Sequence, residues 1–242
     1  MKKVLFLLYQ PYKWLIFIPL AFIITFFWGM AAVLLSFFLK PKIVSYLIGV
    51  SWGRLLIYLT PVFVQIKGRK NIQKRQSYVI IANHLSQYDI LLIYGWLGID
   101  FKWVMKQELR KVPGLGPACE RLEHIFIDRK NPLKSLETIN QAKNRIKNGT
   151  SVIFFPEGTR SRNGEMQEFR RGAFKMAFDL NLPMLPVTIK GTDKILPTSS
   201  LKLFPGKVEM IIHPAINIEN YTWNNVADLI AVTQQQIQKG LE

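Results

Sequence analysis

The chain has 242 residues, which suits one domain, or one domain with a membrane element, and is enough to bury a sizeable core. The formal net charge is +16, and residues 1–88 hold 11 of the 32 Lys and Arg residues but no Asp or Glu. The most basic part is also the most apolar, which argues against a nucleic acid partner and favours an anionic lipid surface. The single cysteine, Cys119, excludes an intrachain disulfide, and we expect it to be a partly buried, small apolar residue.

The first predicted element is an apolar helix over Trp14–Leu39, a run of 26 residues without a charged side chain. As one continuous helix it would be about 39 Å long, enough to cross a bilayer core of about 30 Å. The run is longer than the apolar region of a signal peptide and carries many aromatic residues. It also exceeds the usual core helix of a soluble protein, so we expect it to lie in a membrane.

Two arrangements in the membrane fit this helix. A clean span should carry a basic bias on one side only, but here lysines flank both ends. A second apolar stretch at residues 43–66, interrupted by Arg54, follows the turn signal Lys40-Pro41-Lys42. We therefore favour two helices that dip into one leaflet, with Arg54 at the interface, over a true span. The flanking lysines are Lys2, Lys3, Lys13, Lys40 and Lys42.

Beyond the basic connector at residues 67–76, apolar runs alternate with helical patterns. The predicted strands are 62–67, 78–82, 102–105, 124–127, 152–155, 185–189 and 208–212. The predicted helices are 87–96, 133–146, 174–180 and 223–237. This order predicts an α/β fold with a mixed, largely parallel sheet flanked by helices, preceded by the N-terminal membrane-embedded helical segment. We place the domain boundary so that residues 1–66 form a membrane-associated helical hairpin and residues 67–242 an α/β catalytic domain.

The stretch "ANHLSQYD" contains His84 and, five positions later, Asp89, the first acidic residue of the chain. In one continuous helix the two side chains would point about 140° apart. However, Ser86 is a good N-cap and Ser86-x-x-Asp89 matches a capping box, so the helix should begin near Gln87 and leave His84 in the preceding turn. Asp89 can then accept a hydrogen bond from the imidazole, which leaves the other ring nitrogen free as a base. A surface histidine followed by a capping aspartate fits this motif equally well.

Three further stretches shift the balance towards a functional site. "FPEGTRS" follows a predicted strand and places Glu157 and Arg160 in a loop of the kind that binds ligands in α/β sheets. The planar fork of an arginine suits a phosphate, and "IFIDR" ends another strand with Arg129. Pro186, within the apolar run "MLPVTIKG", suggests an edge strand or a bulge that lines an apolar groove.

Taken in order, the blocks "NHLSQYD", "IFIDR", "FPEGTRS" and "LPV" resemble the glycerolipid acyltransferase family, in particular bacterial 1-acylglycerol-3-phosphate acyltransferases. The first block alone is weakly specific, whereas the ordered set is strongly specific. The resemblance implies transfer of a fatty acyl group from a thioester to the sn-2 hydroxyl of 1-acylglycerol-3-phosphate, giving phosphatidic acid. It implies that His84 is the general base and Asp89 its orienting acid. It also implies acceptor binding by Arg129, Glu157, Gly158, Thr159, Arg160 and Lys106, and acyl-donor binding by Pro186.

A neutral imidazole, with a reference pKa of about 6.5, suits the activation of an alcohol at physiological pH. We expect no metal and no cofactor, because acyl-CoA or acyl carrier protein acts as co-substrate and the two other histidines lie in separate strands. The expected partners are the phospholipid bilayer, the lysophospholipid and the acyl donor, with the active site on the cytoplasmic side of the membrane. Glycerol-3-phosphate or another lysophospholipid remains an alternative acceptor, and a membrane-anchored lipid-binding module without catalysis is an alternative function.

Overall fold

The structure is a computed structural model that describes residues 7, 9–128, 131–161 and 164–242. Within these ranges the chain forms a seven-stranded mixed sheet in the order β1-β7-β6-β2-β5-β3-β4. Only the β6–β7 pair is antiparallel among these neighbours, so the predicted mixed, largely parallel sheet is confirmed. The strands are β1 (Val62–Lys67), β2 (Val79–Ala82), β3 (Asp100–Lys106), β4 (Ile125–Ile127), β5 (Thr150–Phe154), β6 (Met184–Lys190) and β7 (Gly206–Ile212).

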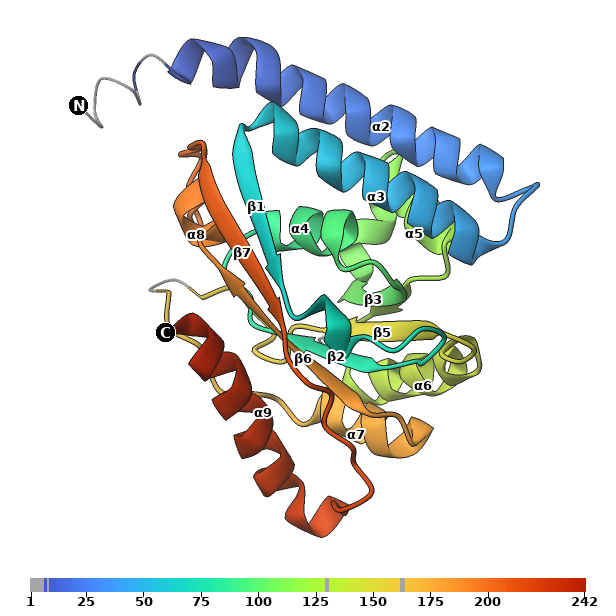
Figure 1. Ribbon diagram of the computed structural model, residues 1–242. Helices are drawn as coiled ribbons and strands as arrows, with labels where there is room; N and C mark the ends of the chain where they lie inside the picture. Colours follow the sequence, from blue (N-terminus) through green and yellow to red (C-terminus); the bar gives the residue numbers. More distant parts are fainter. Residues whose placement is uncertain (1–6, 8, 129–130, 162–163) are drawn as a thin grey trace.

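Helices cover both faces of this sheet (Figure 1). One face carries α2 (Ile18–Leu35), α3 (Pro41–Leu59), α4 (Tyr88–Trp96) and α5 (Leu115–Arg121). The other face carries α6 (Pro132–Ala142), α7 (Gly172–Leu180) and α9 (Val226–Leu241). The remaining helical elements are short: η1 (Tyr12–Phe17), η2 (Arg69–Asn71), η3 (Gln107–Lys111), η4 (Lys143–Arg145), α8 (Thr192–Ile195) and η5 (Trp223–Asn225).

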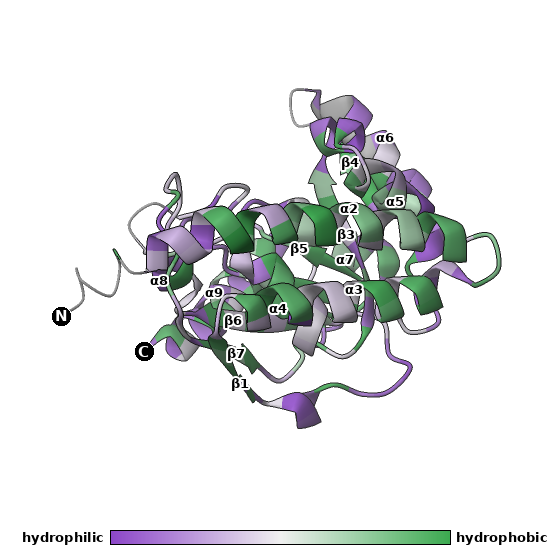
Figure 2. Cartoon of the chain, turned by 90° about the horizontal axis from the view of Figure 1, so that it is seen from above, coloured by the Kyte–Doolittle hydropathy of each residue, from purple (hydrophilic) through white to green (hydrophobic). Residues whose placement is uncertain are grey.

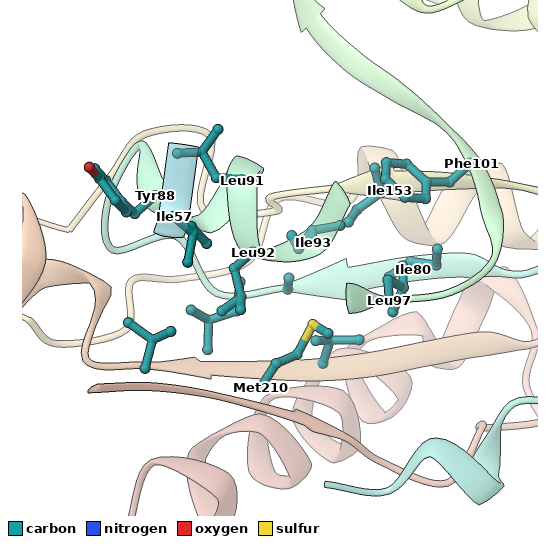
Figure 3. Close-up of a cluster of buried hydrophobic side chains, with 14 of the residues drawn as sticks. Ile57, Ile80, Tyr88, Leu91, Leu92, Ile93, Leu97, Phe101, Ile153 and Met210 are labelled. Carbon is teal, nitrogen blue, oxygen red and sulfur yellow. The ribbon is translucent and has the colours of Figure 1, made fainter. Parts of the chain in front are cut away.

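The hydrophobic core has two main parts, one on each face of the sheet. Ile80 belongs to the cluster on the side of the N-terminal helices, which also includes Leu92 of α4 and Met210 of β7 (Figure 3). Its neighbour Val79 belongs to the opposite cluster, which includes Phe174 of α7. Successive side chains of a strand point to opposite faces, so a strand covered on both faces reads as a continuous apolar run. This explains why β2 was predictable from its sequence.

The N-terminal helices form a hairpin in which α2 and α3 lie side by side (Figure 1). By length and composition, two helices among the described residues are long and apolar enough to cross a membrane, Tyr9–Leu35 and Pro41–Leu59. The outer surface of α2 is apolar (Figure 2), with Phe22 73% exposed and Phe27 60% exposed. An exposed apolar surface of this kind is typical of a site that contacts a membrane or another protein.

By contrast, α3 packs closely on α4 of the α/β part of the chain. A Cβ atom at Gly53 would lie 2.6 Å from the carbonyl oxygen of Leu91, so only glycine permits this approach to α4. Arg54 is the one charged residue of the second apolar stretch, residues 43–66. Its Nε donates a hydrogen bond to the carbonyl oxygen of Gly95 at 2.8 Å. The hairpin is therefore fixed to the helix that carries Asp89.

The predicted domain boundary between residues 66 and 67 falls inside β1, which pairs with β7 in the main sheet. The second apolar stretch, residues 43–66, thus contains the end of the hairpin and an edge strand. The division into a hairpin and a catalytic domain stays a prediction. Two short helices, α5 and α8, were not expected. Gly116 and Pro117 are typical of turns, so the sequence of α5 does not predict a helix. The helix α8 is only one turn long.

Candidate active site

Two of the predicted motif blocks, "NHLSQYD" and "FPEGTRS", meet at the carboxyl ends of β2 and β5. His84 follows β2, and Glu157 follows β5, which pairs with β2 in parallel. Because neighbouring parallel strands end at the same edge of the sheet, their loops lie side by side. The backbone N–H of Ser161 donates to the carbonyl oxygen of His84 at 2.8 Å and ties the two loops together. The sheet thus brings together two motifs that the sequence separates.

His84 and Asp89 form a hydrogen-bonded pair. The distance between His84 Nδ1 and Asp89 Oδ2 is 2.8 Å, and the Asp89 side chain is fully buried. A carboxylate can only accept, so Nδ1 carries the proton of this bond and Nε2 is left as the basic nitrogen of a neutral ring. The His84 side chain is 15% exposed to solvent, so a substrate can reach the ring.

Asp89 also shapes the turn that holds His84. Its Oδ2 accepts hydrogen bonds from the backbone N–H groups of Leu85, at 2.7 Å, and Ser86, at 2.9 Å. Its Oδ1 accepts one from Thr192 Oγ1 of α8, at 2.5 Å. The carboxylate is therefore both a partner of the imidazole and a cap for the turn. The predicted hydrogen bond to the imidazole and the predicted capping contact are thus both present, while the role of His84 as a base stays a prediction.

Ser86 takes part in this turn as predicted, although α4 begins at Tyr88, one residue later than expected. Ser86 Oγ accepts from the backbone N–H of Tyr88 at 3.2 Å and donates to the carbonyl oxygen of Leu196 at 2.7 Å. Its hydroxyl proton is thus engaged in a structural bond, which argues against a role as a nucleophile.

Phe155, which the sequence analysis did not single out, lies flat on the imidazole of His84. The two ring centroids are 3.8 Å apart and the planes differ by 7°. Trp103 of β3 stacks behind Phe155, with centroids 5.6 Å apart. The stack restricts rotation of the His84 ring about χ2, and so it keeps Nδ1 directed at Asp89. Its sequence signal was its place at the end of a predicted strand and at the start of the "FPEGTRS" block.

Glu157 is buried, with 3% of its surface exposed, and both carboxylate oxygens are bonded to the backbone. Oε1 accepts from the N–H of His84 at 2.8 Å, and Oε2 accepts from the N–H of Gln167 at 2.9 Å. Burial raises the pKa of this carboxyl, and the two backbone bonds oppose the rise. Acceptor binding by Glu157 stays a prediction, but the contacts themselves hold the His84 turn against the "FPEGTRS" loop.

The remaining residues that were predicted to bind the acceptor lie around this loop, at the end of β3 or outside the described residues. Gly158 has φ of 77°, and a Cβ there would lie 2.7 Å from the guanidinium carbon of Arg170. Arg160 is partly exposed and Thr159 is exposed beside it. Lys106 is exposed at the end of β3, and Arg129 lies outside the described residues.

The expectation that Pro186 marks an edge strand or a bulge is wrong. The strand β6 lies between β7 and β2 inside the sheet, and its register with β2 is continuous from Met184 to Val187. Pro186 is buried and pairs with Ile81 of β2. Pairing of β6 with β7 begins only at Val187, and the Pro186 carbonyl accepts from the N–H of His213 at 3.0 Å. Proline has no N–H to donate, and at this position the hydrogen-bond ladder between β6 and β7 has already ended. An internal strand can therefore contain Pro186. Acyl-donor binding by Pro186 stays a prediction.

The other two histidines lie in separate hydrogen-bond networks. His124 is buried, with Nε2 2.6 Å from the Tyr94 hydroxyl, and burial lowers its pKa to about 3. His213 Nε2 lies 2.7 Å from Thr188 Oγ1. Among the residues that the structure describes, no group of three or more His, Cys, Asp or Glu side chains is placed to hold a metal ion.

The arrangement defines an α/β enzyme with a hydrogen-bonded histidine at the carboxyl edge of its sheet and an apolar helical hairpin beside it. An acyltransferase family model matches residues 63–190, and the chain belongs to this family. It is 32% identical over 213 residues to a 1-acyl-sn-glycerol-3-phosphate acyltransferase of Pseudomonas aeruginosa, covering 84% of this chain and 80% of the relative.

Plant relatives are similar over a shorter part of their length. A chloroplastic 1-acyl-sn-glycerol-3-phosphate acyltransferase of Brassica napus is 33% identical over 168 residues, which cover 68% of this chain. The chain spans about half of the length of this relative and of an Arabidopsis thaliana relative, 48% and 47%.

The whole fold, including the hairpin, is similar to a solved structure. This is the crystal structure of the 1-acyl-sn-glycerophosphate acyltransferase PlsC from Thermotoga maritima, with a TM-score of 0.82 and 27% sequence identity. The match covers 99% of this chain and 96% of that one. The predicted family and fold class are thereby confirmed.

Proposed function

We propose that this protein transfers a fatty acyl group from an acyl thioester to the sn-2 hydroxyl of 1-acylglycerol-3-phosphate, giving phosphatidic acid. The names of its relatives support this acceptor. The observation that carries the proposal is the 2.8 Å contact between His84 Nδ1 and buried Asp89, which leaves Nε2 as a base on a partly exposed ring. A protein that only bound lipid would have no use for an oriented base.

In the proposed reaction, His84 Nε2 removes the hydroxyl proton as the acceptor oxygen attacks the thioester carbon. The new C–O bond forms, the C–S bond breaks, and the imidazolium returns the proton to the departing thiolate. Asp89 stabilises the imidazolium between these steps, as an orienting acid does in hydrolytic triads. No covalent bond to the enzyme is required.

Arg160 is proposed to hold the acceptor phosphate by a charge-assisted, forked hydrogen bond, and Lys106 to add a further positive charge. The resemblance adds Arg129, which lies outside the described residues, to the same role. The donor is proposed to be acyl-CoA or acyl carrier protein, without a metal or redox cofactor. The apolar hairpin associates with the membrane, and we place the active site on the cytoplasmic side, where both donors are found.

The test is an activity matrix on the purified full chain in detergent, with each acyl donor offered to each acceptor. Phosphatidic acid should form fastest from 1-acylglycerol-3-phosphate, and His84→Ala should lower this rate about 10²- to 10⁴-fold. A higher kcat/KM for glycerol-3-phosphate or another lysophospholipid would contradict the acceptor. Absence of transfer from every donor to every acceptor would contradict the enzymatic function.

A further inference from the structure

The loop between α8 and β7, residues 196–205, is joined to the catalytic turn. Its first residue, Leu196, accepts the hydrogen bond of Ser86 Oγ at 2.7 Å. Two residues later, Thr198 Oγ1 donates to the carbonyl oxygen of Leu85 at 3.0 Å. Leu85 and Ser86 stand between His84 and Asp89, so the start of the loop contacts the turn that orients the base.

The middle of the same loop is joined to the N-terminal helix. Lys13 Nζ, in η1, donates to the carbonyl oxygen of Leu201 at 3.0 Å, across 188 positions of sequence. Lys13 is only 3% exposed. The hydrogen bond therefore gives a partner to an ammonium group that has little contact with solvent. Figure 1 shows the connection between α8 and β7 at the end of the sheet that is nearest the start of the N-terminal helix.

The tip of the loop has the composition of a membrane interface. The Leu201 side chain is 69% exposed, and the next residue, Lys202, is an exposed cation. On η1, to which Leu201 is bonded, Trp14 is 49% exposed and Leu15 is 76% exposed. An apolar side chain beside a lysine that can direct its charge to the headgroups is typical of segments that lie in the interfacial region.

We propose that residues 196–205 form a second contact with the membrane, in which Leu201 enters the leaflet beside η1 and Lys202 meets anionic headgroups. This contact rests on the proposed function, since it serves a site that takes its acceptor from the bilayer. Its surface continues the apolar surface of the hairpin, and its charge complements an anionic lipid. Through Thr198 and Leu196, the same loop supports the His84 turn, so lipid contact and a competent catalytic turn favour each other.

The first experiment measures membrane contact without relying on activity. In the full chain with Cys119→Ala, Leu201→Cys is labelled with an environment-sensitive fluorophore and mixed with vesicles of phosphatidylcholine and phosphatidylglycerol. The emission should shift to shorter wavelength, and brominated lipid should quench it. Trp223→Cys provides a matched exposed control that should not respond, because Trp223 contacts Phe178 of α7 on the other face of the sheet. An unresponsive label at position 201 would overturn the proposal.

The second experiment compares acceptor in vesicles with a short-chain, monomeric acceptor in solution. Leu201→Glu should reduce activity on vesicles about tenfold, because it removes an apolar contact of one leucine. Its kcat/KM with the monomeric acceptor should stay close to wild type, as should both activities of Trp223→Glu. Full activity of Leu201→Glu on vesicles, or an equal loss with both acceptors, would overturn the lipid contact. A wild-type protein inactive with both acceptors would contradict the proposed function, whereas the fluorescence result would stand.

Discussion

The phenyl ring of Phe155 lies against the imidazole of His84 with the ring centroids 3.8 Å apart and the planes inclined by 7°. Phe155 follows β5, and Asp89 belongs to α4, so the imidazole is fixed on its face by one element and at its edge by another. A side chain held from two directions has little freedom to turn its base away from a substrate. This ring pair therefore makes the "FPEGTRS" loop part of the machinery that orients His84.

We expect Phe155→Leu to reduce kcat about ten- to a hundredfold, because a small misplacement of a base has effects of this size. The acceptor KM should change little, since the leucine removes a support and no contact with the phosphate. Phe178→Leu, which removes a ring on the other face of the sheet, should leave kcat unchanged. The measurement is kcat and acceptor KM of both variants by steady-state kinetics. A rise in KM without a fall in kcat would contradict the proposed role of Phe155 in positioning His84.

Asp89→Asn should lower both stability and turnover, because Asp89 accepts two backbone N–H bonds in addition to the imidazole bond. His84→Ala should lose about 10²- to 10⁴-fold in rate, as expected for a general base. Adding Asp89→Asn to His84→Ala should cost little further rate, since residues that act as a unit are not additive. Melting temperature and turnover are measured on the same preparations.

Thr192→Val is the control for this pair. It removes the hydrogen bond to Asp89 Oδ1 and leaves the one between Oδ2 and His84. We expect a loss of stability with turnover largely retained. An Asp89→Asn protein that is destabilised but fully active per folded molecule would show that Asp89 serves only as a cap.

Glu157→Gln should lower kcat with little change in the acceptor KM, because an amide can accept only one of the two backbone hydrogen bonds. Glu157→Ala should also destabilise the fold, by about 1–3 kcal/mol for each buried N–H left without a partner. Kinetics with varied acceptor concentration and thermal unfolding provide the measurements. An increase in acceptor KM alone would instead support the acceptor-binding role that the family resemblance implies.

Arg160→Ala should raise the acceptor KM about ten- to a hundredfold, since a hydrogen bond to a charged group is worth about 1.5–3 kcal/mol. Arg160→Lys should recover only part of this loss, because the forked geometry is absent. The donor KM should be nearly unchanged, and Arg75→Ala, an exposed residue before β2, should behave as wild type. Equal effects on donor and acceptor KM would refute the phosphate-binding role.

His124 should make the fold less stable in acid. Burial lowers its pKa in the folded protein to about 3, compared with a reference value of about 6.5. Below the reference value the unfolded chain binds a proton that the folded chain does not, so stability falls as the pH decreases from about 6.5 towards 3. Each pH unit within this range costs at most about 1.4 kcal/mol.

The measurement is the unfolding midpoint of wild type and His124→Gln in detergent from pH 7.5 down to pH 4.5. The variant should be less stable at neutral pH, because it loses the contact with Tyr94, but its stability should depend less steeply on pH. Parallel pH profiles of the two proteins would show that His124 does not carry this dependence.

The sequence by itself predicted most of the strands and helices around the site, and it predicted a contact between His84 and Asp89 with a surface histidine as an equal alternative. A strand buried on both faces reads as an apolar run, and a capping residue lies next to the helix it caps. The long uncharged N-terminal helix can be recognised from its own composition. All of these signals come from residues within a few positions of one another. The ordered motif blocks added the family, which the comparisons confirmed.

Only the tertiary structure decided which distant groups support the base. Glu157 lies 73 positions from the backbone N–H of His84 that it holds, and Thr192 lies 103 positions from Asp89. The internal position of Pro186 likewise depends on where β7 ends beside β6. Local patterns specify which residues form a strand, but the order and register of strands depend on packing and hydrogen bonds between segments far apart in the chain. The stack of Phe155 on His84 is such a consequence, because it exists only once β5 lies beside β2.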